Sequence, residues 1–358
     1  MRVAKRPRNL SPLPLREGGV FYFCSCFAPP PLVTRLIAER LGHLLLVLWV
    51  VATLTFLLFR LMPGDPTLNF LSPTFSDETR TALLQSFGLD KPLWQQYLIY
   101  LGQLLRGDFG QSFLQNEPAS RILWAALPNT VILTLVSLCL AYVLGIIAGA
   151  FLAFRRGSII EAVAIPTALA TRAAPDFWLG MLVLALFAFQ LGWFPTGGAV
   201  SPGASMGSLG QRLLSGDFWW HLCMPALTLT LFLQGLPLLL MRATMLDVMN
   251  DEFVVMARMK GLSRWSIVMR HAARNALLPV VTAFALGLGA SIGSNVVIET
   301  VFAWPGIGRV LVQAVQGADY PVAQGAFIMI AFVLVVMNTV ADLTYALLDP
   351  RVSVGARR

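Results

Sequence analysis

Residues 250–281 form a long charged segment between two strongly apolar ones, with the sequence NDEFVVMARMKGLSRWSIVMRHAARNALLPVV. The first part of this segment predicts a short amphipathic helix. Asn250 or Asp251 is suited to cap its N-terminus, and Glu252 falls in the first turn, where the helix dipole favours negative charge. The spacing i, i+3, i+4 and i+7 predicts an apolar stripe ending in an amine, formed by Phe253, Met256, Ala257 and Lys260.

A glycine separates this helix from a second one. Gly261 stands where a helix C-terminus favours a residue that is free to take positive φ. Ser263 can cap the next helix, whose predicted buried face comprises Trp265, Val268, Met269 and Ala272. Pro279 then falls at the start of another apolar span. The pattern indicates a helix–glycine–helix element presented to a molecule outside a bilayer. An ordinary amphipathic helix at the membrane surface is the alternative.

The composition of the 358 residues indicates what surrounds this segment. The chain is 57% hydrophobic and only 12% charged, with a mean hydropathy of +0.72. A soluble domain carries about twice that charged fraction, so lipid must cover much of the surface. The apolar runs suit helices rather than barrel strands, which predicts an all-α, polytopic membrane protein. The net charge of +8 comes from basic residues in short loops, which indicates membrane orientation and not nucleic-acid binding.

We expect six transmembrane helices, at about 41–61, 130–154, 172–191, 222–241, 277–298 and 323–347. A basic tail, 1–34, precedes the transmembrane domain, 35–358, and is expected to be disordered. Between the spans lie an external loop, 63–128, and a cytoplasmic loop, 242–276. Pro175 is expected to break the third span, and Gly145 and Gly149 are spaced for close contact between helices.

Lysine and arginine are unevenly distributed between the predicted loops. With the N-terminus inside, six of them fall in the 242–276 loop: Arg242, Arg258, Lys260, Arg264, Arg270 and Arg274. The external loops hold fewer basic residues, and acidic residues outnumber them in 63–128. Because basic residues stay on the cytoplasmic side, this asymmetry predicts that both termini are cytoplasmic.

Little in the sequence predicts catalysis or cofactor binding. It contains no P-loop, no H-E-x-x-H and no G-x-S-x-G motif. The cysteines and histidines are not spaced as metal ligands or as a disulfide framework; they are Cys24, Cys26, Cys139, Cys223, His43, His221 and His271. We therefore expect no enzyme activity, no cofactor and no metal site on this chain, so that energy for transport has to come from a partner.

The 250–281 segment resembles the EAA loop of ABC-importer permease subunits of the dipeptide, oligopeptide and nickel type. The matches are Glu252-Phe253-Val254, Ala257-Arg258, Lys260-Gly261-Leu262-Ser263 and the run 270–280, while Met256 and Met259 replace the usual Thr and Ala. Similar matches occur at Pro63-Gly64-Asp65-Pro66, Gly107-Asp108-Phe109-Gly110, Gly192-Trp193-Phe194-Pro195, 299–308, Asp319-Tyr320-Pro321 and Asp349-Pro350-Arg351. The resemblance covers about residues 35–351.

This resemblance implies the transmembrane domain of a type I ABC importer in a bacterial or archaeal cytoplasmic membrane. It implies a second homologous permease subunit in a heterodimer, two ATPase subunits that hold ATP and Mg, and an extracytoplasmic substrate-binding protein. The ATPase-coupling residues that it implies are Glu252, Phe253, Met256, Ala257, Arg258, Lys260 and Gly261. The expected substrates are di- and oligopeptides. Nickel, glutathione and glycosides are the alternatives for the same machinery.

A secondary carrier is the alternative from a different class. Ion-coupled carriers bury charged groups near the middle of the membrane. The candidates here, Glu299 and Asp342, fall near the ends of predicted spans, where we expect them to make interfacial or inter-helix hydrogen bonds. A membrane-embedded enzyme would need converging polar groups inside the spans, and the sequence offers none.

Overall fold

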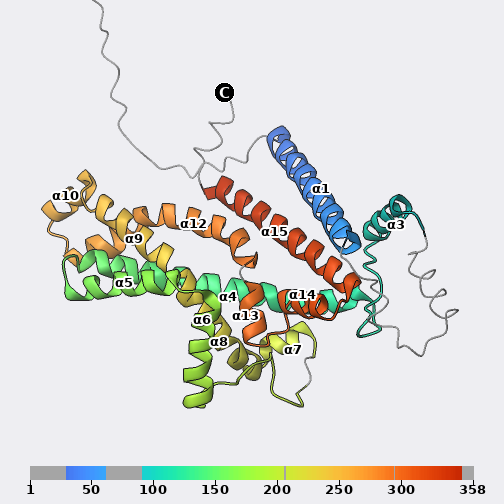
Figure 1. Ribbon diagram of the computed structural model, residues 1–358. Helices are drawn as coiled ribbons and strands as arrows, with labels where there is room; N and C mark the ends of the chain where they lie inside the picture. Colours follow the sequence, from blue (N-terminus) through green and yellow to red (C-terminus); the bar gives the residue numbers. More distant parts are fainter. Residues whose placement is uncertain (1–29, 62–90, 205–206, 294, 349–358) are drawn as a thin grey trace, which may run out of the picture. The chain divides into compact units, whose positions relative to one another are not determined.

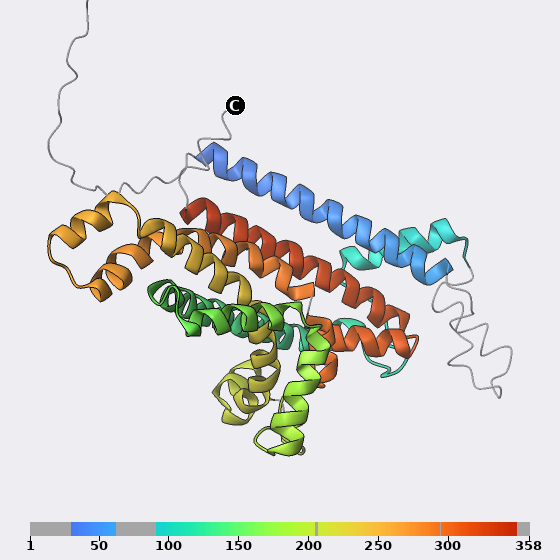
Figure 2. The same ribbon diagram turned by 60° about the vertical axis from the view of Figure 1, so that its left-hand side comes forward.

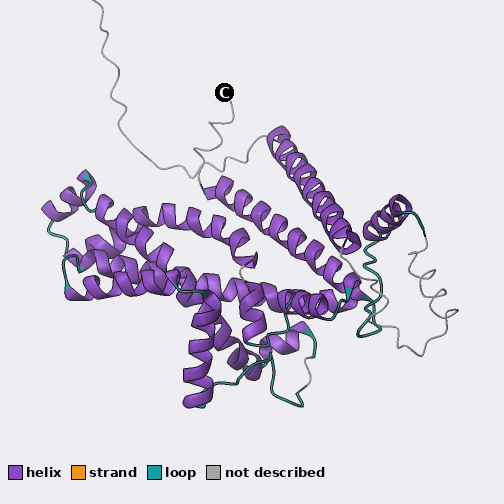
Figure 3. Cartoon of the chain, in the orientation of Figure 1, coloured by secondary structure: helices purple, strands orange, loops and turns teal. Residues whose placement is uncertain are grey.

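The computed structural model describes residues 30–61, 91–204, 207–293 and 295–348. Within these ranges the chain is helical and contains no strand (Figure 3). Residues 1–41 and 42–358 form two compact units, and the packing described below lies within 42–358. The predicted tail, 1–34, lies outside the described residues except for 30–34, which begin the first helix.

The helices are labelled in Figure 1. They are α1 (Pro30–Leu61), α3 (Leu93–Leu105), α4 (Ala119–Phe154), α5 (Ile159–Ala173), α6 (Asp176–Val183), α7 (Leu209–Leu214), α8 (Gly216–Leu233), α9 (Gly235–Val248), α10 (Glu252–Met259), α11 (Arg264–Ser266), α12 (Ala273–Gly293), α13 (Asn295–Val301), α14 (Ile307–Gln316) and α15 (Tyr320–Leu348). Two π-helices, η1 (Leu184–Gln190) and η2 (Ile267–Ala272), continue α6 and α11.

Three helices are long and apolar enough to cross a membrane, namely α1, α4 and α15. Two bent pairs add further candidates: α5 with α6 at 109°, and α8 with α9 at 44°. The described residues therefore hold three to five such spans, which makes the chain a multi-pass membrane protein. The break expected at Pro175 is found between α5 and α6. The fifth predicted span, 277–298, falls on α12 and α13, which are separate helices.

Helix α4 contacts each of the three main groups of buried apolar side chains. Its first turns, around Leu123, pack with α14 and α15, and its middle, around Leu133, packs with α6, α8 and α13. Its last turns, from Leu138 onward, pack with α9, η2 and α12. A helix that is apolar on all sides suits this central position. In the turned view of Figure 2, α12 and α15 run side by side, while α6 and α8 point away from them.

The predicted close contact at Gly145 and Gly149 is confirmed, and the neighbour is α9. A β-carbon at Gly149 would lie 2.5 Å from the carbonyl oxygen of Leu238, and one at Gly145 would lie 2.7 Å from Cγ of Pro237. Only glycine lets the two backbones approach so closely. The pair of glycines therefore fixes where α4 and α9 cross.

Helix α3 lies within the predicted external loop and packs against α1. The hydroxyl groups of Thr53 and Tyr97 are 2.7 Å apart, and the rings of Phe56 and Tyr97 meet edge to face with their centroids 5.3 Å apart. Burial raises the pKa of the Tyr100 hydroxyl beside them. These contacts attach the described end of the predicted external loop to α1.

Two short motifs far apart in the sequence contact each other. The hydroxyl of Ser112 donates to Oδ2 of Asp319 at 2.5 Å, and the backbone amide of Leu114 donates to the same oxygen at 3.3 Å. A β-carbon at Gly110 would lie 3.4 Å from that of Pro321. The loop before α4 is thereby attached to the start of α15.

Candidate functional site

Helix α10 begins at Glu252, as the sequence predicts, but neither candidate side chain caps it. Asp251 occupies the N-cap position, and its side chain makes no capping hydrogen bond. The Asn250 side-chain amide instead donates to the carbonyl of Leu246 at 3.1 Å. Glu252 lies in the first turn, where its charge suits the helix dipole.

The predicted apolar stripe of α10 is only partly right, because Ala257 and Phe253 face the neighbouring helix while Met256 and Lys260 do not. Val254 and Ala257 are the buried residues, and they pack on Ile267 of η2. Phe253 is only partly buried, Met256 is 56% exposed, and Lys260 is exposed. Residues 253–256 are all apolar, so the spacing alone could not indicate which side of the helix would meet its neighbour.

Gly261 ends α10 as predicted. Its φ is +73°, in the left-handed region. The amide of Gly261 donates to the carbonyl of Arg258 at 3.0 Å, and the amide of Leu262 donates to that of Ala257 at 3.3 Å. These two bonds form a Schellman motif, which satisfies the last carbonyls of the helix and reverses the chain.

Ser263 caps the next helix, also as predicted. Its hydroxyl accepts a hydrogen bond of 3.3 Å from the backbone amide of Ser266. The predicted buried face is only half right, because the helix changes to a π-helix at Ile267. Ile267, Val268 and Ala272 are buried, whereas Trp265 and Met269 are exposed. A π turn holds more residues than an α turn, so it rotates the face away from the α-helical expectation.

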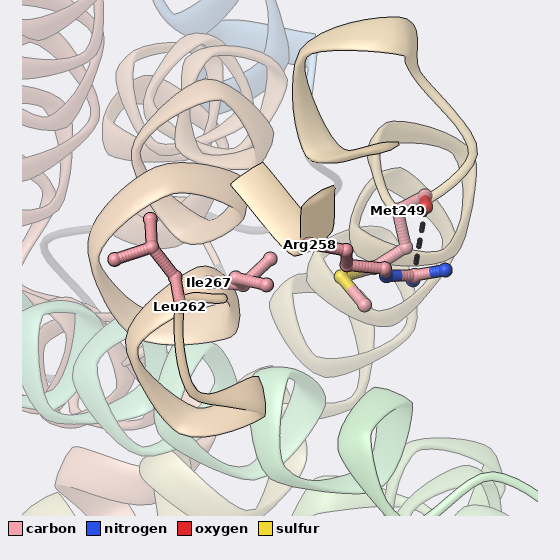
Figure 4. A pocket seen from close by; sticks show the side chains of 4 residues that line it. All are labelled: Met249, Arg258, Leu262 and Ile267. Carbon is pink, nitrogen blue, oxygen red and sulfur yellow. Dashed lines mark hydrogen bonds between the residues drawn. The ribbon is translucent and has the colours of Figure 1, made fainter. Parts of the chain in front are cut away.

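A pocket of about 370 Å³ lies between α10 and η2 (Figure 4). Four residues line it: Met249, Arg258, Leu262 and Ile267. The Arg258 guanidinium donates to the carbonyl of Met249 at 3.5 Å across it. Of the residues predicted to act in coupling, Arg258 lines this pocket.

The second helical part of the element, formed by α11 and η2, packs into the helical core. Val268 and Ala272 belong to the same buried group as Tyr142 of α4 and Met241 of α9. The hydroxyl of Thr244 on α9 donates to the carbonyl of Ala276 on α12 at 3.0 Å. The chain continues from η2 into α12 without a break, so a displacement of η2 would act directly on α12.

Several large apolar side chains of this element are nevertheless exposed. Met259 is 82% exposed, and the others are Val255, Met256, Leu262, Trp265 and Met269. Basic side chains accompany them, because Arg258, Lys260 and Arg270 are exposed as well. A cluster of exposed apolar side chains with charged side chains around it is typical of a protein–protein interface. We call the exposed side chains of α10, together with Leu262 and Trp265, the α10 surface.

Sequence reasoning missed an ion pair beside this element. The guanidinium of Arg242, at the end of the fourth predicted span, donates from Nε to Oε1 of Glu161 at 2.6 Å. The other carboxylate oxygen accepts from the amide of Gly157 at 2.6 Å, and the Ser158 hydroxyl accepts from the amide of Glu161. The Ser-x-x-Glu spacing of a capping box was the available signal. The pair ties the start of α5 to α9.

Glu299 makes the inter-helix hydrogen bonds that the sequence predicts for it. Its fully buried carboxylate accepts from the hydroxyl of Thr130 on α4 at 2.7 Å and from the amide of Arg309 at 3.1 Å. Gly306, the N-cap of α14, has no side chain, so the Glu299 carboxylate takes the place of a capping side chain. Asp342, the other candidate, lies on α15 and is partly buried.

The fold and the site define a multi-pass membrane protein whose helical bundle carries a separate α10 surface. The family model described as "Binding-protein-dependent transport system inner membrane component" matches residues 141–354. The model for the N-terminal part of such components matches residues 33–134. The chain therefore belongs to this family of inner-membrane transport components.

Curated relatives match over nearly their whole length. The di/tripeptide transport system permease protein DppB of Pseudomonas aeruginosa is 36% identical over 88% of this chain and 98% of its own. The oligopeptide transport system permease protein AppB of Bacillus subtilis is 37% identical over 86% of this chain and 95% of its own. The glutathione transport system permease protein GsiC of Escherichia coli is 33% identical over 88% and 98%.

Proposed function

We propose that this chain is a permease subunit of an ATP-driven ABC importer that moves di- and oligopeptides across the cytoplasmic membrane. The relatives named for di/tripeptide and oligopeptide transport support this substrate class. The relative named for glutathione, itself a tripeptide, shows that the same scaffold serves a modified peptide.

The coupling step is assigned to α10. The observation that carries it is that α10 is anchored on one side, by Val254 and Ala257, while its opposite side exposes Met256 and Met259. Exposed methionines adapt well to a partner's groove. We assign Met256 and Met259 as the apolar contact, with Glu252, Arg258 and Lys260 as polar contacts at its edge.

The remaining residues implied in coupling act inside the element. Ala257 and Phe253 pack toward Ile267. Gly261, with its positive φ, forms the bend between α10 and the helix formed by α11 and η2. An ATPase that moves α10 would therefore move η2, and with it α12. Because α12 packs with α4, α9 and α15, that displacement reaches the helices that line the bundle.

Membership of a family of binding-protein-dependent transport components supports the rest of the proposed assembly. In it, two ATPase subunits hold the ATP and Mg and supply the energy, and this chain carries no enzyme activity. A second, homologous permease completes a heterodimer, and an external binding protein delivers the peptide. Six spans are assigned to α1, α4, the α5/α6 pair, the α8/α9 pair, α12 with α13, and α15. The basic residues of 242–276 favour cytoplasmic termini.

The test is a pull-down of the tagged chain from mild detergent in the source organism. The wild type is expected to bring down ATPase subunits and a second permease. Met259→Asp places a carboxylate in the proposed contact and is expected to reduce co-purified ATPase by about tenfold or more. The matched control is Leu105→Asp on α3, because Leu105 is 88% exposed on the opposite, external side of the proposed topology.

Either of two results would contradict the coupling assignment. In one, Met259→Asp retains the ATPase subunits as well as Leu105→Asp does. In the other, the chain purifies alone and transports dialanine in vesicles that contain no ATP, which would instead favour a secondary carrier.

A further inference from the structure

Helix α5 packs mainly on α8 and α9 (Figure 1). Only Glu161 and Ala168 of this helix are buried, whereas Ile159, Ile160 and Val163 are exposed. The two buried residues lie on the same face of α5, because they are seven residues, or about two helical turns, apart. The position of α5 therefore depends on what this one face contacts.

Both buried residues contact α9, at matching positions. The guanidinium of Arg242 donates from Nε to Oε1 of Glu161 at 2.6 Å. Gly235 lies seven residues before Arg242, and a β-carbon there would lie 3.0 Å from the carbonyl oxygen of Ala168. The same β-carbon would lie 3.5 Å from Cδ of Arg172, one turn further along α5. The two helices therefore run antiparallel, with a backbone contact at one end of the shared stretch and an ion pair at the other.

The ion pair is enclosed and uses both carboxylate oxygens of Glu161. The Glu161 side chain is only 10% exposed. Its Oε2 accepts from the amide of Gly157 at 2.6 Å, while Oε1 is bound by Arg242. Removing one partner of such a pair leaves a charge without compensation in a poorly solvated place. The pair therefore holds the first turn of α5 against α9.

Helix α9 is in turn attached to both parts of the helix–glycine–helix element. Residues 249–251 alone separate α9 from α10, and the Arg258 guanidinium donates to the carbonyl of Met249 at 3.5 Å. Met245 of α9 shares a buried group with Val268 of η2. A displacement of α10 or η2 would therefore act on α9 as well as on α12.

We propose that α5 and α9 move as one unit when an ATPase displaces α10, and that Glu161 and Arg242 are the positioning residues that hold this unit together. The inference rests on the proposed coupling role of α10, and it adds a second route beside the one through α12. The unit ends where the chain turns by 109° from α5 into α6, so the displacement is passed on to α6.

The first experiment measures uptake of radiolabelled dialanine in cells of the source organism whose own copy of the gene carries the variant. Glu161→Gln and Arg242→Gln are each expected to lower uptake by about fivefold or more, the lower end of typical couplings between sites. The amount of each variant in the membrane, its co-purified ATPase and the ATP hydrolysis of that complex are expected to match the wild type. Glu117→Gln is the control, because Glu117 is exposed in the loop before α4.

A double variant tests whether the pair acts as a rigid link. Glu161→Leu combined with Arg242→Met replaces the ion pair by apolar side chains, which often stabilise a protein as well as the buried pair did. A rigid link needs packing and not charge. The double variant is therefore expected to recover most of the uptake that Arg242→Met alone loses, because that single variant leaves Glu161 unpaired.

Spin labels on the purified complex measure the movement directly. All four native cysteines are replaced by alanine, and labels are attached at Val163 on α5 and Leu236 on α9, which are both exposed. The distance between these labels is expected to be the same with and without ATP trapped by vanadate, and to broaden in Glu161→Gln. A second pair, Val163 with the exposed Val340 on α15, is expected to change its distance when ATP is trapped.

The outcomes separate this inference from the proposed function. If Glu161→Gln takes up dialanine as well as the wild type does, the α5/α9 unit is wrong and the importer assignment stands. The same conclusion follows if the double variant recovers no uptake, if trapped ATP changes the Val163–Leu236 distance, or if it leaves the Val163–Val340 distance unchanged. If the wild-type complex contains no ATPase, the proposed function fails, and this inference fails with it.

Discussion

The hydroxyl of Thr130 donates a 2.7 Å hydrogen bond to the buried carboxylate of Glu299, and the same hydroxyl accepts one of 2.8 Å from the backbone amide of Ile307. Thr130 therefore links α4 to both ends of the motif that runs from Glu299 into α14. Because all three groups are buried, each bond replaces one that water would otherwise provide.

Thr130→Val should destabilise the folded chain. Valine has nearly the same shape as threonine but leaves the Glu299 oxygen and the Ile307 amide without that partner. Each unsatisfied buried group costs about 1–3 kcal/mol. The check is the midpoint of thermal unfolding in detergent. Thr300→Val is the control, because the exposed Thr300 hydroxyl bonds only to its own helix, at Val296. Equal midpoints for the two variants would show that the Thr130 bridge contributes nothing.

Gly306→Ala should be poorly tolerated. A β-carbon there would overlap the carboxyl group of Glu299, which is itself fixed by Thr130 and Arg309. Forcing an extra methyl group into a packed site costs about 1–3 kcal/mol. The amount of protein in the membrane and its melting midpoint are the measurements. Gly216→Ala, which has no atom within 4 Å of the new carbon, should behave as the wild type. A normal midpoint for Gly306→Ala would contradict the role of Glu299 as the cap of α14.

Gly149→Ala tests the crossing of α4 and α9. Its β-carbon would lie 2.5 Å from the Leu238 carbonyl oxygen and 2.9 Å from Cβ of Met241, so the two helices would have to separate. We expect a lower melting midpoint, by an amount that corresponds to about 1–3 kcal/mol. Gly102→Ala in α3 has open space and should be neutral or stabilising by about 0.5–1 kcal/mol, because alanine favours a helix interior. If both variants melt alike, the close approach at Gly149 is not required.

Gly261→Ala tests whether the bend after α10 has to be exact for coupling. Gly261 has φ of +73°, where an alanine is strained by about 1–2 kcal/mol, although no atom obstructs its β-carbon. We expect less ATPase to co-purify and less dialanine uptake, with normal amounts in the membrane. Gly261→Asn is the matched variant, because asparagine tolerates positive φ, and it should lie between alanine and the wild type. The idea fails if alanine and asparagine variants both transport as the wild type does.

Local patterns predicted the parts of the fold that depend on a few neighbouring residues. Gly261 ends α10 and Ser263 begins the next helix, because backbone conformation and capping are decided within a turn. The Gly145 and Gly149 pair predicted a close contact, although it did not identify α9 as the neighbour. The expected hydrogen bonding of Glu299 followed from its place at the end of a span, but the partners did not.

The sequence by itself determined the membrane class, the family and the position of the helix–glycine–helix element, since these depend on composition, motif and local chain geometry. Only the tertiary structure decided that Val254, Ala257 and Ile267 are buried while Met256 and Met259 are exposed. Residues 253–256 are all apolar and point in different directions around the short helix. Which of them is buried therefore depends on the orientation of the neighbouring η2, whose π turn rotates its buried face. The structure likewise decided that the two helix breaks meet at Arg172 and Gly235, because such contacts join segments that no local pattern relates.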